Sequence, residues 1–416
     1  MVEEQNEIIY SFLPHDLIDD INIENENTDA ESPLEDPVQE SKAKSFQKDF
    51  NNFSLGRFAQ DAFDCSSLYK AFPLCCPIKQ YIERNPINNQ SIYHQFLSRL
   101  NTSLSNTIMS YSGSQYLQKM LNFMSNEDIS ELLQTVSKDL TDIMCNCYGN
   151  YFIQKIIKNA NVHQRIFILT MIQNDFIQIA KNPSGTHCLQ TFIDGITTKE
   201  EERLIKKNVK THLLDLSFNP SGTHIVQKLL TNISQVNRNY IVKFIISNFF
   251  LLCKNLNGAT VIKKFIAETS NTKISSLVIS MLEVNFLEMC KDQYANYVIQ
   301  FALEIYGYNQ CKNIVNNILN NIVSLGQEKY SSNVIDKVTI QIKHNNMGQF
   351  EQLIRYVLLT KANFNRLNNS KYGQYVLINI IKMISPECKN IIKAVLINDI
   401  EFCETIKCSK VFNFLM

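Results

Sequence analysis

The sequence predicts an all-α solenoid made of eight stacked units of about 36 residues, preceded by an acidic tail. Three observations support this fold class. An eight-residue motif recurs at nearly constant spacing, each copy has the apolar periodicity of a helix, and the segments between the copies have helical periodicity as well. A unit of this size cannot bury its own apolar face, so consecutive units must stack on one another.

The motif occurs eight times and is easiest to see after the phrase NPSG, which is present at 182–185 and again at 219–222. The copies are SQYLQKML from Ser114, NYFIQKII from Asn150, THCLQTFI from Thr186, THIVQKLL from Thr223, ATVIKKFI from Ala259, NYVIQFAL from Asn296, SNVIDKVT from Ser332 and QYVLINII from Gln374. Their starts are 36, 36, 37, 36, 37, 36 and 42 residues apart. We number the copies repeats 1 to 8 and their residues positions one to eight.

The apolar residues of the motif fall on one side of a helix. Positions three, four and seven are apolar in every repeat, and position eight is apolar except at Thr339. At about 100° per residue these positions share one continuous arc, so residues such as Met120 and Cys188 are predicted to lie in the core. Positions one, two and five fall on the opposite side, and we expect them to form an exposed face.

Further helices are predicted between the motifs, for example at 163–182 and 201–219, where apolar residues recur at three- and four-residue steps. One unit therefore accommodates two helices and a short third helix. We expect capping segments at 78–98 and from about 385 to the last residue. The repeat domain would then cover 78–416, and residues 51–77 form an unassigned linker.

The charge of the chain is unevenly distributed. The 40 basic and 40 acidic residues cancel overall, but residues 1–45 contain 13 acidic and 2 basic residues. The rest of the chain has 27 acidic and 38 basic residues. We predict that residues 1–50 form an acidic, disordered tail without the features of a secretory signal.

The sequence contains no recognisable catalytic motif, because it lacks a phosphate-binding glycine-rich loop, paired metal-binding histidines and a nucleophile elbow. Its 12 cysteines do not have zinc-finger spacing, and we expect them to be reduced thiols. No apolar run is long enough to span a membrane. We therefore expect a cytoplasmic, non-enzymatic protein that needs no metal and no cofactor.

The exposed positions form a pattern of their own. They are Asn, Tyr and Gln in repeats 2 and 6, Thr, His and Gln in repeats 3 and 4, and Ser, Asn and Asp in repeat 7. Positions one and five are one helical turn apart and can reach the same planar group, while position two lies beside them. Amides and carboxylates can bond a base edge, and flat side chains can stack on its face. We term positions one and five the edge pair and position two the stacking position of a base pocket.

These motifs together resemble the PUF (Pumilio homology) family of RNA-binding proteins. The resemblance rests on the runs GNYFIQK, ANYVIQ, SSNVIDK and YGQYVL, on the eightfold count and on the longer last spacing. It implies a right-handed, curved α-solenoid of eight Pumilio repeats with terminal capping repeats, in which the second helix of each repeat contacts one base of single-stranded RNA. The implied base-edge residues are Ser114, Gln118, Asn150, Gln154, Thr186, Gln190, Thr223, Gln227, Ala259, Lys263, Asn296, Gln300, Ser332, Asp336 and Gln374. The implied stacking residues are Gln115, Tyr151, His187, His224, Thr260, Tyr297, Asn333 and Tyr375.

The resemblance also implies that the RNA runs antiparallel to the protein, so that repeat 8 meets the 5′ end. The Asn–Gln edge pairs of repeats 2 and 6 then imply uracil, and the Ser–Asp pair of repeat 7 implies guanine. The Ser–Gln pair of repeat 1 and the Thr–Gln pairs of repeats 3 and 4 imply adenine. The expected site is close to 5′-UGUNAAUA.

Three edge residues depart from the family's pattern. Lys263 can only donate hydrogen bonds, Ile378 removes one edge contact, and Asp336 is one methylene shorter than the usual glutamate. Lysines at position six allow two interpretations, a solvated helix face or a positive field for phosphates. These lysines are Lys119, Lys155, Lys228, Lys264 and Lys337.

The resemblance finally implies a monomer that binds mRNA 3′ untranslated regions and represses translation or mRNA stability. Deadenylase or translational repressor proteins would be its partners in that role. Two alternatives stay open. One is a nucleolar PUF-like ribosome-assembly factor with low sequence specificity, and the other is a protein-binding helical scaffold.

Overall fold

The computed structural model describes residues 103–415, except 233–234 and 398–409. Every regular element in these residues is a helix, and the chain divides into two compact units between Met171 and Ile172. The expected tail at 1–50, the linker at 51–77 and the first capping segment at 78–98 lie outside the described residues.

The unit that ends at Met171 contains repeats 1 and 2. Its helices are α7 (Leu104–Ile108), α8 (Tyr111–Met120), η1 (Leu121–Phe123), α9 (Asn126–Thr135), η2 (Ser137–Asp139), α10 (Leu140–Cys145), α11 (Gly149–Asn159) and α12 (Val162–Met171).

The unit that begins at Ile172 contains repeats 3 to 8. Its helices are α13 (Phe176–Lys181), α14 (Gly185–Asp194), α15 (Lys199–Val209), η3 (Lys210–His212), α16 (Leu213–Phe218), α17 (Gly222–Asn232), α18 (Gln235–Ser247), α19 (Phe249–Cys253), α20 (Leu256–Thr269), α21 (Ile274–Lys291), α22 (Ala295–Gln310), α23 (Lys312–Asn320), α24 (Ile322–Gly326), α25 (Ser331–Asn345), α26 (Met347–Ile354), the π-helical η4 (Arg355–Leu359), α27 (Lys361–Asn368), α28 (Lys371–Met383), α29 (Pro386–Ile397) and α31 (Phe412–Leu415).

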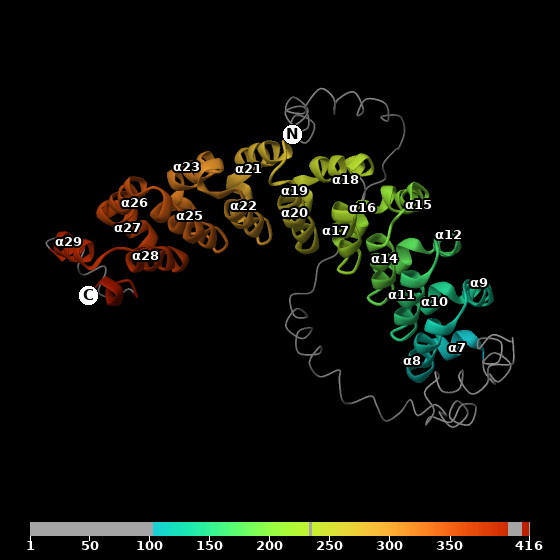
Figure 1. The fold of residues 1–416 in the computed structure, drawn as a ribbon. Helices are drawn as coiled ribbons and strands as arrows, with labels where there is room; N and C mark the ends of the chain where they lie inside the picture. Colours follow the sequence, from blue (N-terminus) through green and yellow to red (C-terminus); the bar gives the residue numbers. More distant parts are fainter. Residues whose placement is uncertain (1–102, 233–234, 398–409, 416) are drawn as a thin grey trace, which may run out of the picture. The chain divides into compact units, whose positions relative to one another are not determined.

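The motif lies on the second long helix of each repeat, as expected. In the unit that begins at Ile172, these helices pack in sequence order, with α14 against α17, α17 against α20, α20 against α22, α22 against α25 and α25 against α28. Figure 1 shows α18, α21, α23 and α26 along the opposite edge of this unit. Each repeat of this unit therefore buries its apolar face against its neighbours, and the predicted solenoid stacking is confirmed.

The predicted core arc is confirmed as well. Positions three, four, seven and eight are buried in repeats 2 to 8, and the residues singled out, Met120 and Cys188, are completely buried. Thr339, the single polar residue on this arc, is buried too, and its hydroxyl donates to the carbonyl oxygen of Ile335 at 2.8 Å. Because that hydrogen bond stays inside the helix, the hydroxyl can be buried at small cost.

A turn that recurs between repeats connects the short helix of a repeat to its motif helix. In NPSG, the side-chain oxygen Oδ1 of Asn219 accepts hydrogen bonds from the backbone N–H groups of Ser221 at 2.9 Å and Gly222 at 2.8 Å. Asn182 makes the equivalent bonds one repeat earlier. A Cβ atom on Gly222 would lie 2.7 Å from the carbonyl oxygen of Leu216, so this position requires the absence of a side chain.

The larger spacing before repeat 8 is filled by helix. The motif helix of repeat 7, α25, continues to Asn345, and α26 then leads into the π-helical turn Arg355–Leu359. The predicted C-terminal cap from residue 385 coincides with α29 and α31, with 398–409 outside the described residues.

The described cysteines are free thiols, and four of them are buried: Cys188, Cys253, Cys290 and Cys311. Burial raises the pKa of the Cys290 and Cys311 thiols to about 12, so both remain protonated at neutral pH. Among the residues that the structure describes, no cluster of His, Cys, Asp or Glu could hold a metal ion. None of the described helices combines the length and apolarity needed to cross a membrane.

Candidate nucleic-acid interface

The edge pairs and stacking positions differ sharply in exposure. Position two is exposed in most repeats, with Tyr151 at 59% and Tyr297 at 53%, whereas position five is half-buried in repeats 1 to 7. Position one is buried in repeats 1 to 7, so the expectation that it is exposed was wrong. The helical angle was correct, but in repeats 1 and 3 the hydroxyl group at position one bonds a backbone carbonyl group of the following repeat, at Tyr148 and Ser221.

Hydrogen bonds join the two members of the edge pair in five repeats. In each case the side-chain Nε2 of the glutamine at position five donates to the side-chain oxygen at position one. The pairs are Gln118 to Ser114 at 3.1 Å, Gln154 to Asn150 at 2.9 Å, Gln190 to Thr186 at 3.3 Å, Gln227 to Thr223 at 2.8 Å and Gln300 to Asn296 at 3.0 Å. The protein itself thus holds these glutamine amides in one orientation, and a group held in this way loses less entropy when it binds a ligand.

Position one is itself fixed by backbone carbonyl groups. Asn150 and Asn296 donate from Nδ2 to the carbonyl oxygens of Asn146 and Asp292, both at 2.8 Å. The hydroxyl of Ser114 donates instead to the carbonyl oxygen of Tyr148 in the next repeat, at 2.8 Å. Position one therefore orients the glutamine and offers little surface of its own to a ligand.

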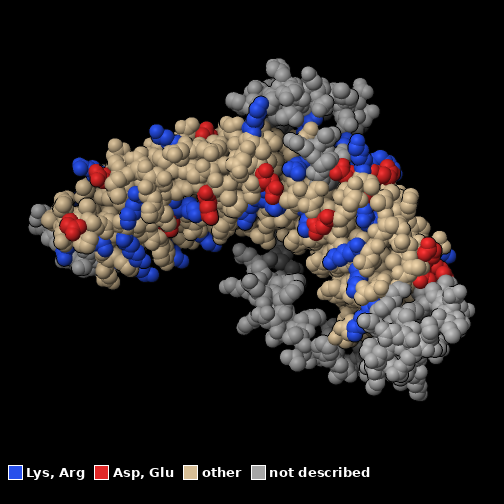
Figure 2. Space-filling view, in the orientation of Figure 1, with Lys and Arg blue, Asp and Glu red and all other residues tan. Residues whose placement is uncertain are grey.

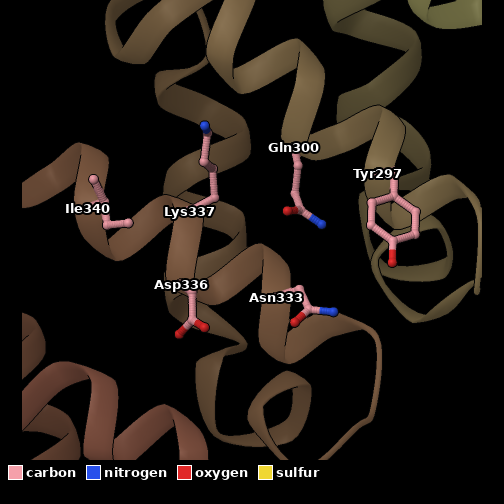
Figure 3. A pocket seen from close by; sticks show the side chains of 6 residues that line it. All are labelled: Tyr297, Gln300, Asn333, Asp336, Lys337 and Ile340. Atoms are coloured by element: carbon pink, nitrogen blue, oxygen red, sulfur yellow. The ribbon is translucent and has the colours of Figure 1, made fainter.

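A recess of about 400 Å³ lies between the motif helices of repeats 6 and 7. Tyr297 and Gln300 project into it from α22, and Asn333, Asp336, Lys337 and Ile340 line it from α25 (Figure 3). Figure 3 shows the Gln300 amide extending toward Asn333, with the Tyr297 ring beside it. The recess thus combines an amide, a flat ring, a carboxylate and a lysine.

Asp336 in repeat 7 has a partner that the sequence analysis missed. Its Oδ2 accepts a hydrogen bond from Nδ2 of Asn379, at 2.7 Å, across to repeat 8. Burial raises the pKa of the Asp336 carboxyl above its usual value, and the bond from Asn379 partly opposes this increase. Asn379 occupies position six, where five other repeats have lysine, and this departure was the available signal.

Repeats 5, 7 and 8 lack the hydrogen bond that joins the edge pair in the other five repeats. In repeat 7 the hydroxyl of Ser332 donates instead to the carbonyl oxygen of Lys329, at 3.0 Å. In repeat 8, Ile378 is only 6% exposed and belongs to the core, while Nε2 of Gln374 donates to the carbonyl oxygen of Asn368 at 2.8 Å. In repeat 5, Ala259 is buried and Lys263 replaces the glutamine. The stacking residue Thr260 is half-buried, because its hydroxyl faces repeat 4.

Three of the position-six lysines are in ion pairs. Lys228 contacts Asp194 at 2.7 Å and Lys337 contacts Glu304 at 2.8 Å, in each case on the preceding repeat. Lys264 contacts Glu268 on its own helix at 2.8 Å. Figure 2 shows acidic and basic side chains interspersed over the segment from α20 to α22. The paired lysines therefore offer a smaller positive field than their number suggests.

A family model described as the Pumilio-family RNA-binding repeat matches residues 110–137, 140–172, 175–207, 212–246 and 285–319. These ranges contain the motifs of repeats 1 to 4 and 6. The motifs of repeats 5, 7 and 8 lie outside them, and these are the repeats that contain Lys263, Asp336 and Ile378.

Relatives of the chain include plant and fungal proteins. Pumilio homolog 11 of Arabidopsis thaliana is 23% identical over 310 residues, which are 72% of this chain and 53% of the relative. Suppressor protein MPT5 of Saccharomyces cerevisiae is 24% identical over 312 residues, which are 66% of this chain and 36% of the relative. The chain thus spans between about a third and about half of these proteins.

Solved structures with the same fold cover more of the chain. The Puf4 RNA-binding domain bound to the HO endonuclease RNA 3′ UTR recognition sequence is 23% identical, with a TM-score of 0.62, and the match covers 73% of this chain and 92% of that domain. The RNA-binding domain of yeast Puf5p bound to AAT2 RNA is 21% identical, with a TM-score of 0.59, and the match covers 76% and 96%. The matched repeats and the shared fold place the chain in the PUF (Pumilio) family of RNA-binding, non-enzymatic repeat proteins.

Proposed function

We propose that this protein binds single-stranded RNA with a UGU core, close to 5′-UGUNAAUA, in the 3′ untranslated regions of mRNA. The observation that supports this is the hydrogen-bonded edge pair, which recurs at the same two positions in five repeats. A protein-binding scaffold has no need for such a register. Each pair presents a glutamine amide where a base edge would lie, next to a side chain suited to stacking.

The UGU core follows from repeats 6 to 8. Gln300, which Asn296 orients, presents an N–H donor and a C=O acceptor to uracil, and the carboxylate of Asp336 can accept from N1–H and N2–H of guanine. At the first base, repeat 8 has Tyr375 for stacking but no edge pair, so uracil is favoured there only weakly. The fourth base faces Lys263 and is not selected.

Selection of RNA from a random pool by the full chain tests this proposal. We expect enrichment of single-stranded sequences with UGU, followed after one base by an A-rich segment. Enrichment of duplex RNA, or of no common sequence, would favour the ribosome-assembly alternative and contradict the proposal.

The regulatory role is a further part of the proposal. We infer that the protein acts in the cytoplasm as a monomer and lowers translation or stability of bound mRNA by recruiting a deadenylase or a translational repressor. A reporter mRNA with 5′-UGUNAAUA in its 3′ untranslated region should be expressed less when the protein is present. The matched reporter with the UGU changed to ACA should not respond, and equal repression of both reporters would contradict this role.

A further inference from the structure

Repeats 3 and 4 have the same residues at all three base-facing positions. Thr186, His187 and Gln190 in repeat 3 correspond to Thr223, His224 and Gln227 in repeat 4. If the three residues alone determined the base, the two repeats would read their bases identically. The structure shows that their hydrogen bonds differ.

In repeat 4, a third side chain joins the edge pair. Nε2 of Gln227 donates to the hydroxyl oxygen of Thr223 at 2.8 Å and also to the hydroxyl oxygen of Thr260 at 3.1 Å. Thr260 is the position-two residue of the following repeat. Its own hydroxyl hydrogen is donated to the carbonyl oxygen of Asn257 at 2.6 Å, so toward Gln227 it acts as an acceptor.

The hydrogens of this cluster are therefore all used internally. Gln227 has two N–H hydrogens on Nε2, and each has an acceptor. The hydroxyl of Thr223 lies 3.3 Å from that of Thr260 and donates to it, because the Thr260 hydrogen is already committed. Only the carbonyl oxygen Oε1 of Gln227 is left to face a base.

In repeat 3 the corresponding glutamine is held by one bond. Nε2 of Gln190 donates to Thr186 at 3.3 Å, and the Thr186 hydroxyl donates to the carbonyl oxygen of Ser221 at 3.1 Å. The residue at position two of the following repeat is His224, which is exposed. Gln190 thus keeps one N–H donor and one C=O acceptor for a base.

We propose that Thr260 is a positioning residue that makes repeat 4 less selective than repeat 3. This inference rests on the proposed RNA binding. A glutamine recognises adenine by donating one hydrogen bond and accepting another. Gln227 can only accept, and every base has an N–H group that can donate to it. Adenine selection therefore requires Gln227 to break its bond with Thr260, whereas Gln190 can select adenine directly.

The test uses the full chain and RNAs based on 5′-UGUAAAUA. All four bases are placed in turn at the fifth base, which repeat 4 reads, or at the sixth base, which repeat 3 reads. For the wild type, we expect about ten-fold preference for adenine at the sixth base and less than about three-fold at the fifth base. Thr260→Val, which keeps the shape of the side chain and removes the acceptor, should raise the adenine preference at the fifth base to about ten-fold. The preference at the sixth base should not change.

Thr260→Ser is the matched comparison, because it keeps the hydroxyl, and it should keep the wild-type difference in adenine preference between the fifth and sixth bases. Equal adenine preference at the fifth and sixth bases in the wild type would overturn the inference. The inference would also be overturned if Thr260→Val had the same adenine preference at the fifth base as the wild type. It would be overturned as well if the Ser and Val variants changed this preference equally, because an equal change would reflect packing alone.

A second measurement needs no RNA. In the free protein labelled with ¹⁵N, the side-chain N–H hydrogens of Gln227 should exchange with solvent more slowly than those of Gln190, and Thr260→Val should remove the difference. Equal exchange in the wild type would overturn the inference. If the chain binds none of the RNAs, the proposed function fails, and the exchange rates still decide whether Thr260 holds Gln227.

Discussion

Repeats 6 and 8 have the same stacking residue but different edge pairs. Tyr297 and Tyr375 are similarly exposed, at 53% and 48%. In repeat 6, Gln300 is hydrogen-bonded to Asn296 and faces the recess, whereas in repeat 8 Ile378 is buried and Gln374 bonds a backbone carbonyl group. The comparison shows that a repeat can keep the exposed tyrosine without the hydrogen-bonded glutamine. Under the proposed function, stacking and edge reading are therefore separate properties of a repeat.

The largest expected effect comes from making repeat 6 resemble repeat 8. Gln300→Ile removes the edge amide and leaves Tyr297 in place. We expect the preference for uracil at the third base to fall by as much as about 100-fold, because a paired edge contact contributes up to about 3 kcal/mol of discrimination. Fluorescence anisotropy with RNAs that differ only at this base measures the effect.

Gln352→Ile is the matched control for that substitution, since Gln352 is exposed on α26, outside the motif. It should leave the base preference unchanged. A Gln300→Ile variant that still selects uracil would show that the edge pair does not read the base.

Removal of the stacking ring should lower the affinity for RNA and leave the base preference unchanged. Tyr297→Ala should weaken binding by about ten-fold for RNAs with any base at the third position, because stacking does not depend on base identity. Tyr356→Ala provides the control, since this tyrosine has a similar exposure of 47% but lies on η4. A change in base preference without a loss of affinity would contradict the separation of the two properties.

The turn before the motif should affect stability more than selectivity. Gly222→Ala should lower the free energy of unfolding by about 2 kcal/mol, because the added Cβ would overlap the carbonyl oxygen of Leu216. At Gly348 the nearest atom to an added Cβ is 3.7 Å away, so Gly348→Ala should be neutral or stabilising. Urea denaturation followed by circular dichroism compares the two variants, and equal effects would remove the steric explanation.

The smallest expected effect concerns pH and repeat 7. Burial raises the pKa of Asp336, so its carboxylate begins to protonate at a higher pH than an exposed aspartate. Guanine preference at the second base should therefore decrease as the pH falls from 7 to 5. The stability of the free protein should change in the opposite direction and increase as the pH falls. The folded state holds this proton more tightly than the unfolded state, so the charged carboxylate lowers the free energy of unfolding at pH values above both pKa values.

Asp336→Asn separates the two consequences. It should abolish the pH dependence of guanine preference and leave the stability at pH 7 unchanged or higher. The amide that replaces the carboxylate has no charge to bury, and its oxygen can still accept from Asn379. If the guanine preference of this variant still depended on pH, a titratable group other than Asp336 would be responsible.

The sequence predicted most of the fold because the period and the apolar arc depend on residues within one repeat. It did not predict the burial of position one, for example at Asn296, because this burial depends on contacts outside the motif itself. Asn379 and Thr260 were missed as partners for the same reason. Each acts on the edge pair of the preceding repeat, 43 and 33 residues earlier along the chain, and a helical projection contains no information about such contacts.

The edge pairs themselves could be located from the sequence, but their chemistry could not. Repeats 3 and 4 have identical residues at the three base-facing positions, but Gln190 and Gln227 have different numbers of N–H groups available to a ligand. Similarly, the sequence shows that Ile378 cannot bond a base, and only the structure shows that Gln374 is turned toward Asn368.

The central claim is that each edge pair reads one base. The most direct test replaces the edge pair of repeat 7 with that of repeat 6, by the double substitution Ser332→Asn and Asp336→Gln. The affinity of this variant is then measured for RNAs with each base at every position of 5′-UGUAAAUA. We predict that the preference at the second base changes from guanine to uracil and that all other positions keep theirs. An unchanged guanine preference, or changes at several positions at once, would contradict the account.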